Sequence, residues 1–523
     1  MSRRPLLRLS RPLWQRRWWS TEVDPCAEGT EKKGLVLGVF EGCKEGEMKL
    51  SNTGRKFDEE TGGKLSELIK GQDLTLGKAR VFHNLSSEFY AIAVAGAGPE
   101  AAGYNENEVL DECRENIRVA AGVGAMALQK NGVEKIYVEA FTNASSAAEG
   151  STLGVWKFQE LKNKNNRSTE STVDLYEDPD SDNWARGRIR AESQNIARKL
   201  EETPANIMTP MAFAQAAIEI LCPCGVQVDI RDRDWIMEKG MTAFLAMARS
   251  SCDPPLFLEI SYCGGSEEDK PVVLVGKGTT FDSGGLCLKK CRPMSEMKAS
   301  MAGGAVIVGA MKAIALLGLP VNINALIPLM ENMPGGMAMK PGDVVAGLAK
   351  RTMKIEKPSH EGRIILADTL SYAAQFKPCL TITIGVLASG TRVAMSSAAS
   401  AAYTSSEVVW QEIKKAGSVS GDRVWRWPAW KFYSKNVTDF ECCDVDNVGK
   451  GFGGGPPMAN AFLMEFAPPV DFLHIDIHGT GMRSNGTPPY LRDGHMSGRP
   501  TRTLIQFLNQ MACPLDANSE CGG

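Results

Sequence analysis

Short apolar runs alternate with longer helical stretches along most of the chain. In the first part, the runs 88–96 and 135–140 are typical of strands, and 106–131 has the spacing of a helix between them. The polar stretch 161–183 predicts a surface loop around one short strand. Alternation of this kind indicates a largely parallel sheet covered by helices.

The pattern becomes more apolar after residue 203. Near-continuous Val, Ile and Leu in the predicted strands indicates burial on both faces, and functional groups then gather in loops beyond the carboxyl ends of the strands. Strands are expected at 226–231, 256–262, 271–276, 322–330, 380–388 and 471–477, and helices near 209–221, 233–250, 296–316, 363–376, 404–416 and 499–512. The small-residue segments 396–406 and 451–457 are expected to be loops.

The sequence thus predicts an α/β protein of two domains, each a mostly parallel sheet flanked by helices. A length of 523 residues is enough for more than one buried core. A charge-rich amphipathic helix at 184–202 is expected to link the amino-terminal domain, 35–183, to the carboxyl-terminal domain, 203–523. The prolines that follow this helix mark the boundary.

The first 21 residues contain six arginines, no lysine and no acid, with leucines and tryptophans between the charges. This composition is typical of a mitochondrial transit peptide and predicts a matrix protein, the alternative being a disordered basic tail. Without these arginines, 53 basic residues face 62 acidic ones. The mature chain is therefore expected to be acidic.

Composition excludes several classes of partner. The net charge is −3 and the basic cluster is terminal, so we expect no nucleic-acid binding. We find no apolar run of the roughly 18 residues that span a bilayer, so we expect no membrane partner.

The 14 cysteines show no disulfide framework and no paired spacing typical of a zinc site. Most are therefore expected to be buried thiols.

Two segments have the character of strand-end loops rich in ionisable groups. They are "VGKGTTFDSGG", which begins at residue 275 and is followed by "LCLKK", and "KPSHEGRIILADTL", which begins at 357. Their ionisable groups include Lys277, Asp282 and Lys289 in the first and His360, Glu361 and Arg363 in the second.

These segments resemble the leucyl aminopeptidase family, peptidase family M17, whose signature is N-T-D-A-E-G-R-L. The resemblance extends through "TPANIMTPMAFAQAA", "GDRVWRWP", "HIDIHGTG" and "SGRPTRTLIQFL", and so covers residues 200–512 in order. It implies the M17 fold and a site of two divalent metals, zinc, manganese or magnesium, that removes amino-terminal residues from peptides. The first half resembles that family's amino-terminal domain only in architecture.

The resemblance also implies roles for individual residues. Lys277 matches a lysine that binds metal, and Asp282 and Glu361 match the carboxylates that bridge the two metals. Lys289 matches the lysine that polarises the scissile carbonyl. Arg363 matches the arginine that holds a bicarbonate acting as general base.

Two ligand positions depart from the family pattern. Ser300 and Ser359 stand where the family has aspartates. A neutral hydroxyl is a poor ligand for a hard dication. Since even outer-shell losses cost about 10- to 100-fold, the two together are expected to lower metal affinity by at least roughly 10² to 10⁴. We therefore expect no metal, or weakly bound metal.

The remaining charges favour ion pairs within the site. Two carboxylates, Asp282 and Glu361, face three cations, Lys277, Lys289 and Arg363. Lys277 could bind a metal only as a neutral amine, and deprotonating a lysine at pH 7 costs about 4 to 5 kcal/mol. The sequence therefore predicts a metal-free salt-bridge cluster.

Some alternatives remain open. His360 beside Ser359, or Glu296 four residues before Ser300, could replace a lost ligand. "LVGKG" suggests a P-loop but lacks its first glycine and the final Ser or Thr. A serine–histidine dyad lacks the G-x-S-x-G elbow.

Three functions follow from these observations. The first is a catalytically impaired or inactive leucyl aminopeptidase-like protein that serves as a structural or assembly hexamer, since the resemblance implies a homohexamer. The second is an active dinuclear-metal aminopeptidase acting on peptides. The third is a non-catalytic peptide-binding regulator. The leader and lost ligands together are similar to those of sperm-abundant leucyl aminopeptidase-like proteins of insects.

Overall fold

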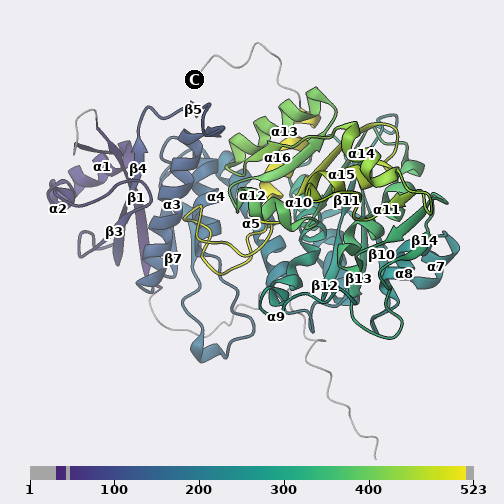
Figure 1. The fold of residues 1–523 in the computed structure, drawn as a ribbon. Helices are drawn as coiled ribbons and strands as arrows, with labels where there is room; N and C mark the ends of the chain where they lie inside the picture. The colour runs from purple at the N-terminus through teal and green to yellow at the C-terminus, as the bar shows by residue number, and fades with distance from the viewer. Residues whose placement is uncertain (1–30, 43–46, 514–523) are drawn as a thin grey trace, which may run out of the picture.

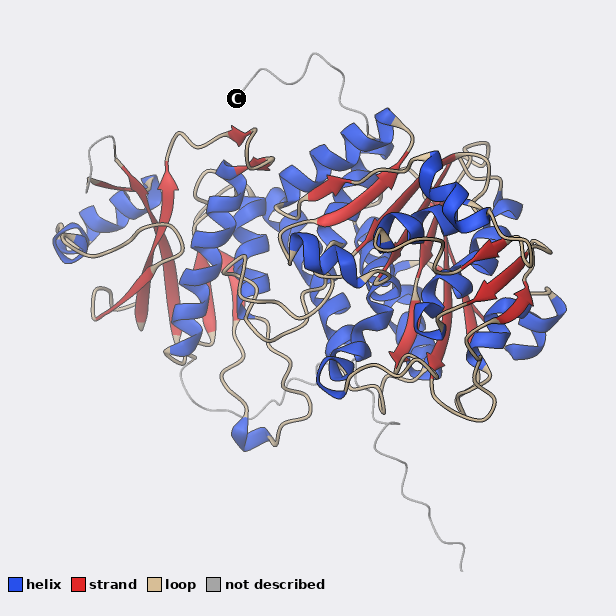
Figure 2. Cartoon of the chain, viewed as in Figure 1, coloured by secondary structure: helices blue, strands red, loops and turns tan. Residues whose placement is uncertain are grey.

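The structure is a computed structural model that describes residues 31–42 and 47–513. The chain is an α/β protein with two large sheets, both mostly parallel and flanked by helices, as the sequence predicts (Figures 1 and 2). The predicted transit peptide, residues 1–21, lies outside the described residues.

The amino-terminal sheet has the order β3-β4-β1-β7-β8, and β2 pairs with β1. Leu35 and Leu37 of β1 pack under helices α1 and α2, whereas Val36 packs under α3 and α4, as expected for a strand buried on both faces. The strands are β1 (Lys33–Glu41), β2 (Met48–Leu50), β3 (Ala79–His83), β4 (Ala91–Pro99), β7 (Lys135–Val138) and β8 (Thr172–Leu175). The helices are α1 (Asn52–Glu60), α2 (Lys64–Ile69), α3 (Glu112–Lys130) and α4 (Ala144–Val155).

Helix α5 (Ser181–Glu202) follows this sheet in the chain and packs against α4 on one side and α10 on the other. A buried ion-pair network also joins the two halves of the molecule. Arg118 of α3 and Arg502 of α16 both donate to Glu149 Oε2 of α4, each at 2.7 Å. The two sheets are therefore held together by shared charges as well as by helix packing.

The carboxyl-terminal sheet has the order β18-β17-β20-β16-β11-β13-β10-β9, with β12 beside β13. Two apolar cores, one on each face, bury its central strands. The strands are β9 (Gln227–Arg231), β10 (Leu256–Cys263), β11 (Val272–Gly276), β12 (Gly278–Asp282), β13 (Asn322–Asn332), β16 (Leu380–Gly385), β17 (Ser400–Thr404), β18 (Val424–Arg426) and β20 (Asp471–Asp476). A small sheet contains β14 (Asp343–Ala346), β15 (Thr352–Ile355) and β19 (Val445–Asp446).

Helices cover both faces of this sheet (Figure 2). One of them, the stretch Ser295–Leu316, is long and apolar enough to cross a membrane, but 83% of its apolar window is buried inside the protein, as in a core helix. The helices are α6 (Pro210–Leu221), α7 (Arg233–Glu238), α8 (Thr242–Ala248), α9 (Cys291–Met294), α10 (Ala302–Leu316), α11 (Glu361–Ala373), α12 (Ser389–Met395), α13 (Glu407–Ser420), α14 (Lys431–Thr438), α15 (Gly455–Met464) and α16 (Thr501–Ala512).

Three expectations from the sequence were wrong. The segment 233–250 is two helices, because Gly240, at φ 78°, ends the first. The segment 396–406 is not a loop throughout, because β17 forms inside it between β18 and β20. Of the described cysteines only Cys443 is buried, since most of the others lie at element ends or in loops.

Candidate active site

Lys277 lies at the centre of the candidate site, between β11 and β12, and is 2% exposed. Its side chain runs between Gly362 and Gly385, where an added Cβ would come within about 3 Å of it. Its Nζ lies 2.6 Å from Glu361 Oε1 and donates to Ser300 Oγ at 2.8 Å and to the Val386 carbonyl at 3.0 Å. The Lys277 ammonium therefore has two hydrogen-bond acceptors and one carboxylate oxygen at ion-pair distance, although Glu361 Oε1 itself has no hydrogen-bond partner among the described residues.

Asp282, the last residue of β12, forms the second ion pair, with Lys289. Its Oδ1 also accepts from the Gly284 backbone N–H and from Asn332 Nδ2, both at 2.9 Å. The turn depends on glycine, because Gly284 has φ 93° and an added Cβ would lie 2.4 Å from the Cys287 carbonyl. The carboxylate of Asp282 is thus occupied by donors of this chain.

The two serines at the family's aspartate positions lie in different surroundings. Ser300 is fully buried in a 3-10 helix, Ser295–Met301, and its hydroxyl accepts from Lys277. Ser359 is half-buried in another 3-10 helix, Pro358–His360, two residues before Glu361. Both departures therefore lie in helical turns that border Lys277 and Glu361.

Arg363 is buried but does not pair with either carboxylate. Its Nη1 donates to the Asn447 carbonyl at 2.6 Å and its Nη2 to the Gly455 carbonyl at 3.2 Å. Burial lowers the pKa of Arg363 to about 10, so the group stays charged at neutral pH. The structure thus contains both lysine–carboxylate pairs of the predicted cluster. Arg363, the third predicted cation, donates to backbone carbonyls instead.

The two proposed replacement ligands differ. Glu296 Oε2 accepts from Arg392 Nη1 at 3.0 Å, so it is held in an ion pair. His360 has a buried Nδ1 that no described residue hydrogen-bonds. Burial, with the charges of Arg363 and Lys357, lowers the pKa of His360 to about 3. His360 is therefore a neutral imidazole at physiological pH.

His478 also lies near charged groups of the site, and the sequence predicted no role for it. It lies two residues after Asp476, at the carboxyl end of β20, and its Nδ1 is buried without a hydrogen-bond partner within residues 31–42 and 47–513. Burial, then the charges of Lys277 and Arg392, lower the pKa of His478 to about 3. Its position just beyond the carboxyl end of a predicted strand was the sequence signal that could have identified it.

The pKa values of the two carboxylates shift in opposite directions. Burial pushes the pKa of Asp282 up, but the charges of Lys289 and Lys277 hold it below its usual value. Burial and the nearby charge of Asp282 raise the pKa of Glu361 despite the contact with Lys277. Two carboxylates that share one site commonly separate in this way.

The donors present do not fit a pair of divalent metal ions. Residues 31–42 and 47–513 contain no group of three or more His, Cys, Asp or Glu side chains arranged to hold a metal. Both carboxylates are paired with lysines, and Ser300 offers only a neutral oxygen. Hard dications bind charged oxygen, and two such ions need more than two carboxylates to balance their charge.

Comparisons with known proteins assign the family. The model of the cytosol aminopeptidase family catalytic domain matches residues 195–505, and that of its N-terminal domain matches residues 36–165. Cytosol aminopeptidase of Xenopus tropicalis is 42% identical over 92% of this chain and 93% of its own length. That of Homo sapiens is 41% identical over 91% and 92%.

A solved structure agrees. The bottromycin maturation enzyme BotP is 27% identical over 92% of this chain and 99% of its own, with a TM-score of 0.78, and one of its structures is a complex with Mn. The expectation that the first half resembles the family only in architecture was wrong, because the amino-terminal family model matches its sequence. The chain is leucyl aminopeptidase-like and belongs to the cytosol aminopeptidase family, peptidase family M17.

Proposed function

We propose that this chain is a catalytically inactive aminopeptidase homologue that serves as a structural or assembly protein. The observation that carries the proposal is the environment of Lys277. Its Nζ donates to Ser300 Oγ and the Val386 carbonyl and forms an ion pair with Glu361 Oε1, which together suit an ammonium ion. A lysine that binds metal must give up this proton.

The charge count supports the same function. In the family pattern, aspartates at positions 300 and 359 would bring the number of carboxylates to four, whereas this site has two. Each missing carboxylate leaves a metal with less anionic charge and fewer ligands. The lysine ammoniums then remain the natural counterions for Asp282 and Glu361.

The assembly we propose is a homohexamer in the mitochondrial matrix. The hexamer is what membership of the family implies, and its formation does not require chemistry at the site. The matrix location rests on the arginine-rich first 21 residues, which lie outside the described structure. Size-exclusion chromatography with light scattering tests the hexamer, and fractionation of cells tests the location.

A second candidate is an aminopeptidase with an altered metal preference. The buried, unpaired Nδ1 atoms of His360 and His478 favour it, because both imidazoles are neutral at physiological pH and could act as ligands. The two candidate functions differ in the amount of metal bound per chain, since only the second requires bound metal.

The test is to purify the full chain with manganese or zinc, measure bound metal per chain by mass spectrometry, and assay hydrolysis of leucine p-nitroanilide. We expect less than one metal per chain and no turnover. Replacing both serines, Ser300→Asp with Ser359→Asp, is expected to restore metal binding. The matched control is Ser300→Asn with Ser359→Asn, which adds the same volume without charge.

Two metals per chain with ordinary turnover in the unaltered protein would overturn the proposal. Partial metal with slow turnover, lost on changing His360→Ala, would favour the second candidate. Saturable binding of a peptide without hydrolysis would instead indicate a peptide-binding regulator.

A further inference from the structure

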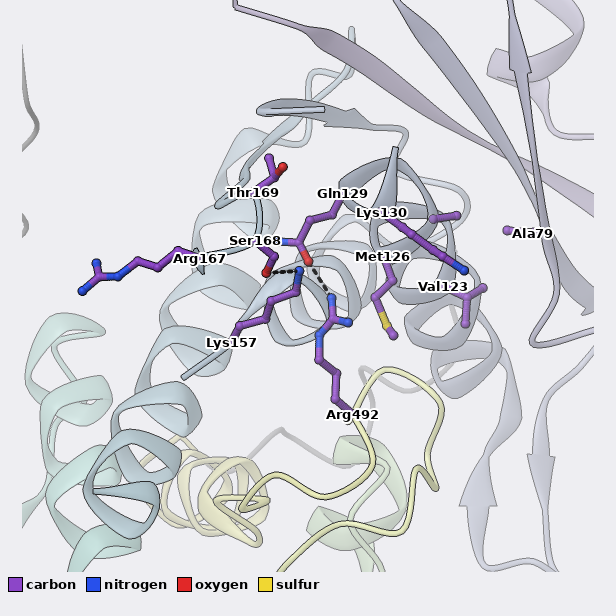
Figure 3. Close-up of a pocket in the computed structure, with 11 residues that line it drawn as sticks. Ala79, Val123, Met126, Gln129, Lys130, Lys157, Arg167, Ser168, Thr169 and Arg492 are labelled. Carbon is purple, nitrogen blue, oxygen red and sulfur yellow. Dashed lines mark hydrogen bonds between the residues drawn. The ribbon is translucent and has the colours of Figure 1, made fainter. Parts of the chain in front are cut away.

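A basic pocket lies away from the candidate active site, where the amino-terminal domain meets a loop of the carboxyl-terminal half (Figure 3). Its volume is about 590 Å³. Four cationic residues border it, Lys130 from α3, Lys157 and Arg167 from the segment after α4, and Arg492 from the loop before α16. Among the described residues that line the pocket, none is acidic.

Lys157 and Arg492 converge in this pocket. Figure 3 shows their charged ends pointing toward one another, with Lys157 Nζ donating to Ser168 Oγ at 2.8 Å and Arg492 Nη2 to Gln129 Oε1 at 2.6 Å. Both acceptors are neutral. Burial, then the charges of Arg492 and Lys162, lower the pKa of Lys157, and burial lowers that of Arg492.

Arg492 is left incompletely satisfied. Its Nε is buried and has no hydrogen-bond partner in the part of the chain that the structure describes. Among the described residues, no carboxylate forms an ion pair with Arg492 or Lys157, although the protein as a whole has more acids than bases. Like charges brought together and partly buried without a counterion are costly, and an anion between them would remove that cost.

The other two cations have different roles. Arg167 donates to the backbone carbonyls of Lys162 and Glu160 and points away from the pocket in Figure 3. Lys130 is exposed at the end of α3 and points toward the side of Val123. Val123 and Met126 provide an apolar wall beside the charged groups.

We propose that this pocket binds a small phosphate monoester, with the phosphoryl group between Lys157 and Arg492 and the organic part against Val123 and Met126. An arginine fork and a lysine point charge together complement the oxygens of a phosphate dianion. The volume is in the range of small-molecule sites. Since Arg492 and Lys157 come from opposite halves of the molecule, the ligand joins the two domains.

The test is isothermal titration of the full chain with inorganic phosphate, phenyl phosphate and citrate. We expect one site per chain, with phenyl phosphate bound about 10-fold more tightly than inorganic phosphate because it also covers the apolar wall. We expect Lys157→Gln and Arg492→Gln each to weaken binding at least about 10-fold, since each removes a charge-assisted hydrogen bond.

The matched control is Lys56→Gln, which makes the same charge change at an exposed lysine of α1 and should leave affinity unchanged. Arg492→Gln also removes the hydrogen bond to Gln129, so Lys157→Gln, which frees only the exposed Ser168, keeps the test valid if the arginine variant unfolds. Absence of saturable binding, equal binding by the Lys157→Gln variant, or tighter binding of citrate than of phenyl phosphate would overturn the proposal.

Discussion

The candidate active site and the basic pocket arrange charge in opposite ways. In the active site, Lys277 pairs with Glu361 and Lys289 pairs with Asp282, so each lysine has a carboxylate of this chain. In the basic pocket, Lys157 and Arg492 donate only to neutral oxygens and lie near each other. The two active-site lysines are thus neutralised by carboxylates of this chain, whereas the two cations of the basic pocket keep an uncompensated positive charge.

This difference shows why a resemblance in sequence does not decide where a protein binds ligands. The site with the family's residues has lost two carboxylates and satisfies its remaining charges internally. The basic pocket matches no motif in the sequence, yet its charges remain available. A counterion supplied by the chain removes much of the reason to bind an external ion.

The largest effect is expected from breaking the buried pair in the active site. Glu361→Gln would leave the ammonium of Lys277, 2% exposed, without its carboxylate. We expect the free energy of unfolding to fall by about 3 to 5 kcal/mol, as for other buried pairs with one partner removed. Urea denaturation followed by circular dichroism measures it.

An exposed pair is the control for this prediction. Asp439→Asn removes the surface contact with Lys450 and should leave the urea midpoint almost unchanged. Changing both members of the buried pair, Lys277→Met with Glu361→Leu, should recover much of the loss. Equal effects of Glu361→Gln and Asp439→Asn would show that Lys277 is not held by Glu361.

Glu139 is a buried anion without a cationic partner among the described ion pairs, in contrast to the unpaired cations of the basic pocket. It is a buried carboxylate that accepts from Ser51 Oγ at 2.7 Å and from the Gly38 backbone N–H, and burial raises the pKa of Glu139 to about 7. A raised pKa means that its contribution to stability is complete below about pH 4.5 and is lost as the pH rises through 7. We expect about 2 to 3 kcal/mol to be lost between pH 5 and pH 8.

Glu139→Gln should remove that pH dependence, because an amide keeps the shape without titrating. The measurement is urea denaturation of both proteins at several pH values, and the useful quantity is the difference between them. The difference should shift in favour of the variant as the pH rises. A difference that is constant from pH 5 to pH 8 would mean that Glu139 keeps an ordinary pKa in the folded protein.

The sequence predicts the central sheet well because its strands are long and apolar. The strand predicted at 256–262 is observed as β10, Leu256–Cys263, and that predicted at 471–477 as β20, Asp471–Asp476. Strand β17, Ser400–Thr404, was missed because its small residues carry little β-propensity, and it forms through its position beside β20.

The sequence also predicts the lysine–carboxylate pairs of the site but not the basic pocket. Lys277, Asp282 and Glu361 lie in segments that a motif identifies, and their charge balance predicts their pairing. Arg492 and Gln129, by contrast, are 363 positions apart and meet only because the two domains pack together. Arg363 was expected to join the cluster, but the loop that holds Asn447 provides it with a carbonyl instead.

A smaller loss is expected from Lys289→Met. Lys289 is 24% exposed at its side chain, and Asp282 would keep its bonds from Gly284 and Asn332. We expect stability to fall by about 1 kcal/mol, since a partly solvated pair contributes less than a buried one. The urea midpoint measures this loss, and one as large as that of Glu361→Gln would show that the two pairs form a single cooperative unit.

The smallest effect is expected in the basic pocket, from Lys130→Gln. Lys130 is exposed at the end of α3, so its charge acts on a bound phosphate through solvent and without a fixed hydrogen bond. We expect the affinity for phenyl phosphate to fall about two- to threefold at low salt and to be almost unchanged near 0.15 M salt, where screening is strong. Titrations at two salt concentrations, beside the Lys157→Gln variant, measure both values. A loss as large as that of Lys157→Gln, persisting at the higher salt, would place Lys130 in direct contact with the phosphate and move the centre of the binding site toward α3.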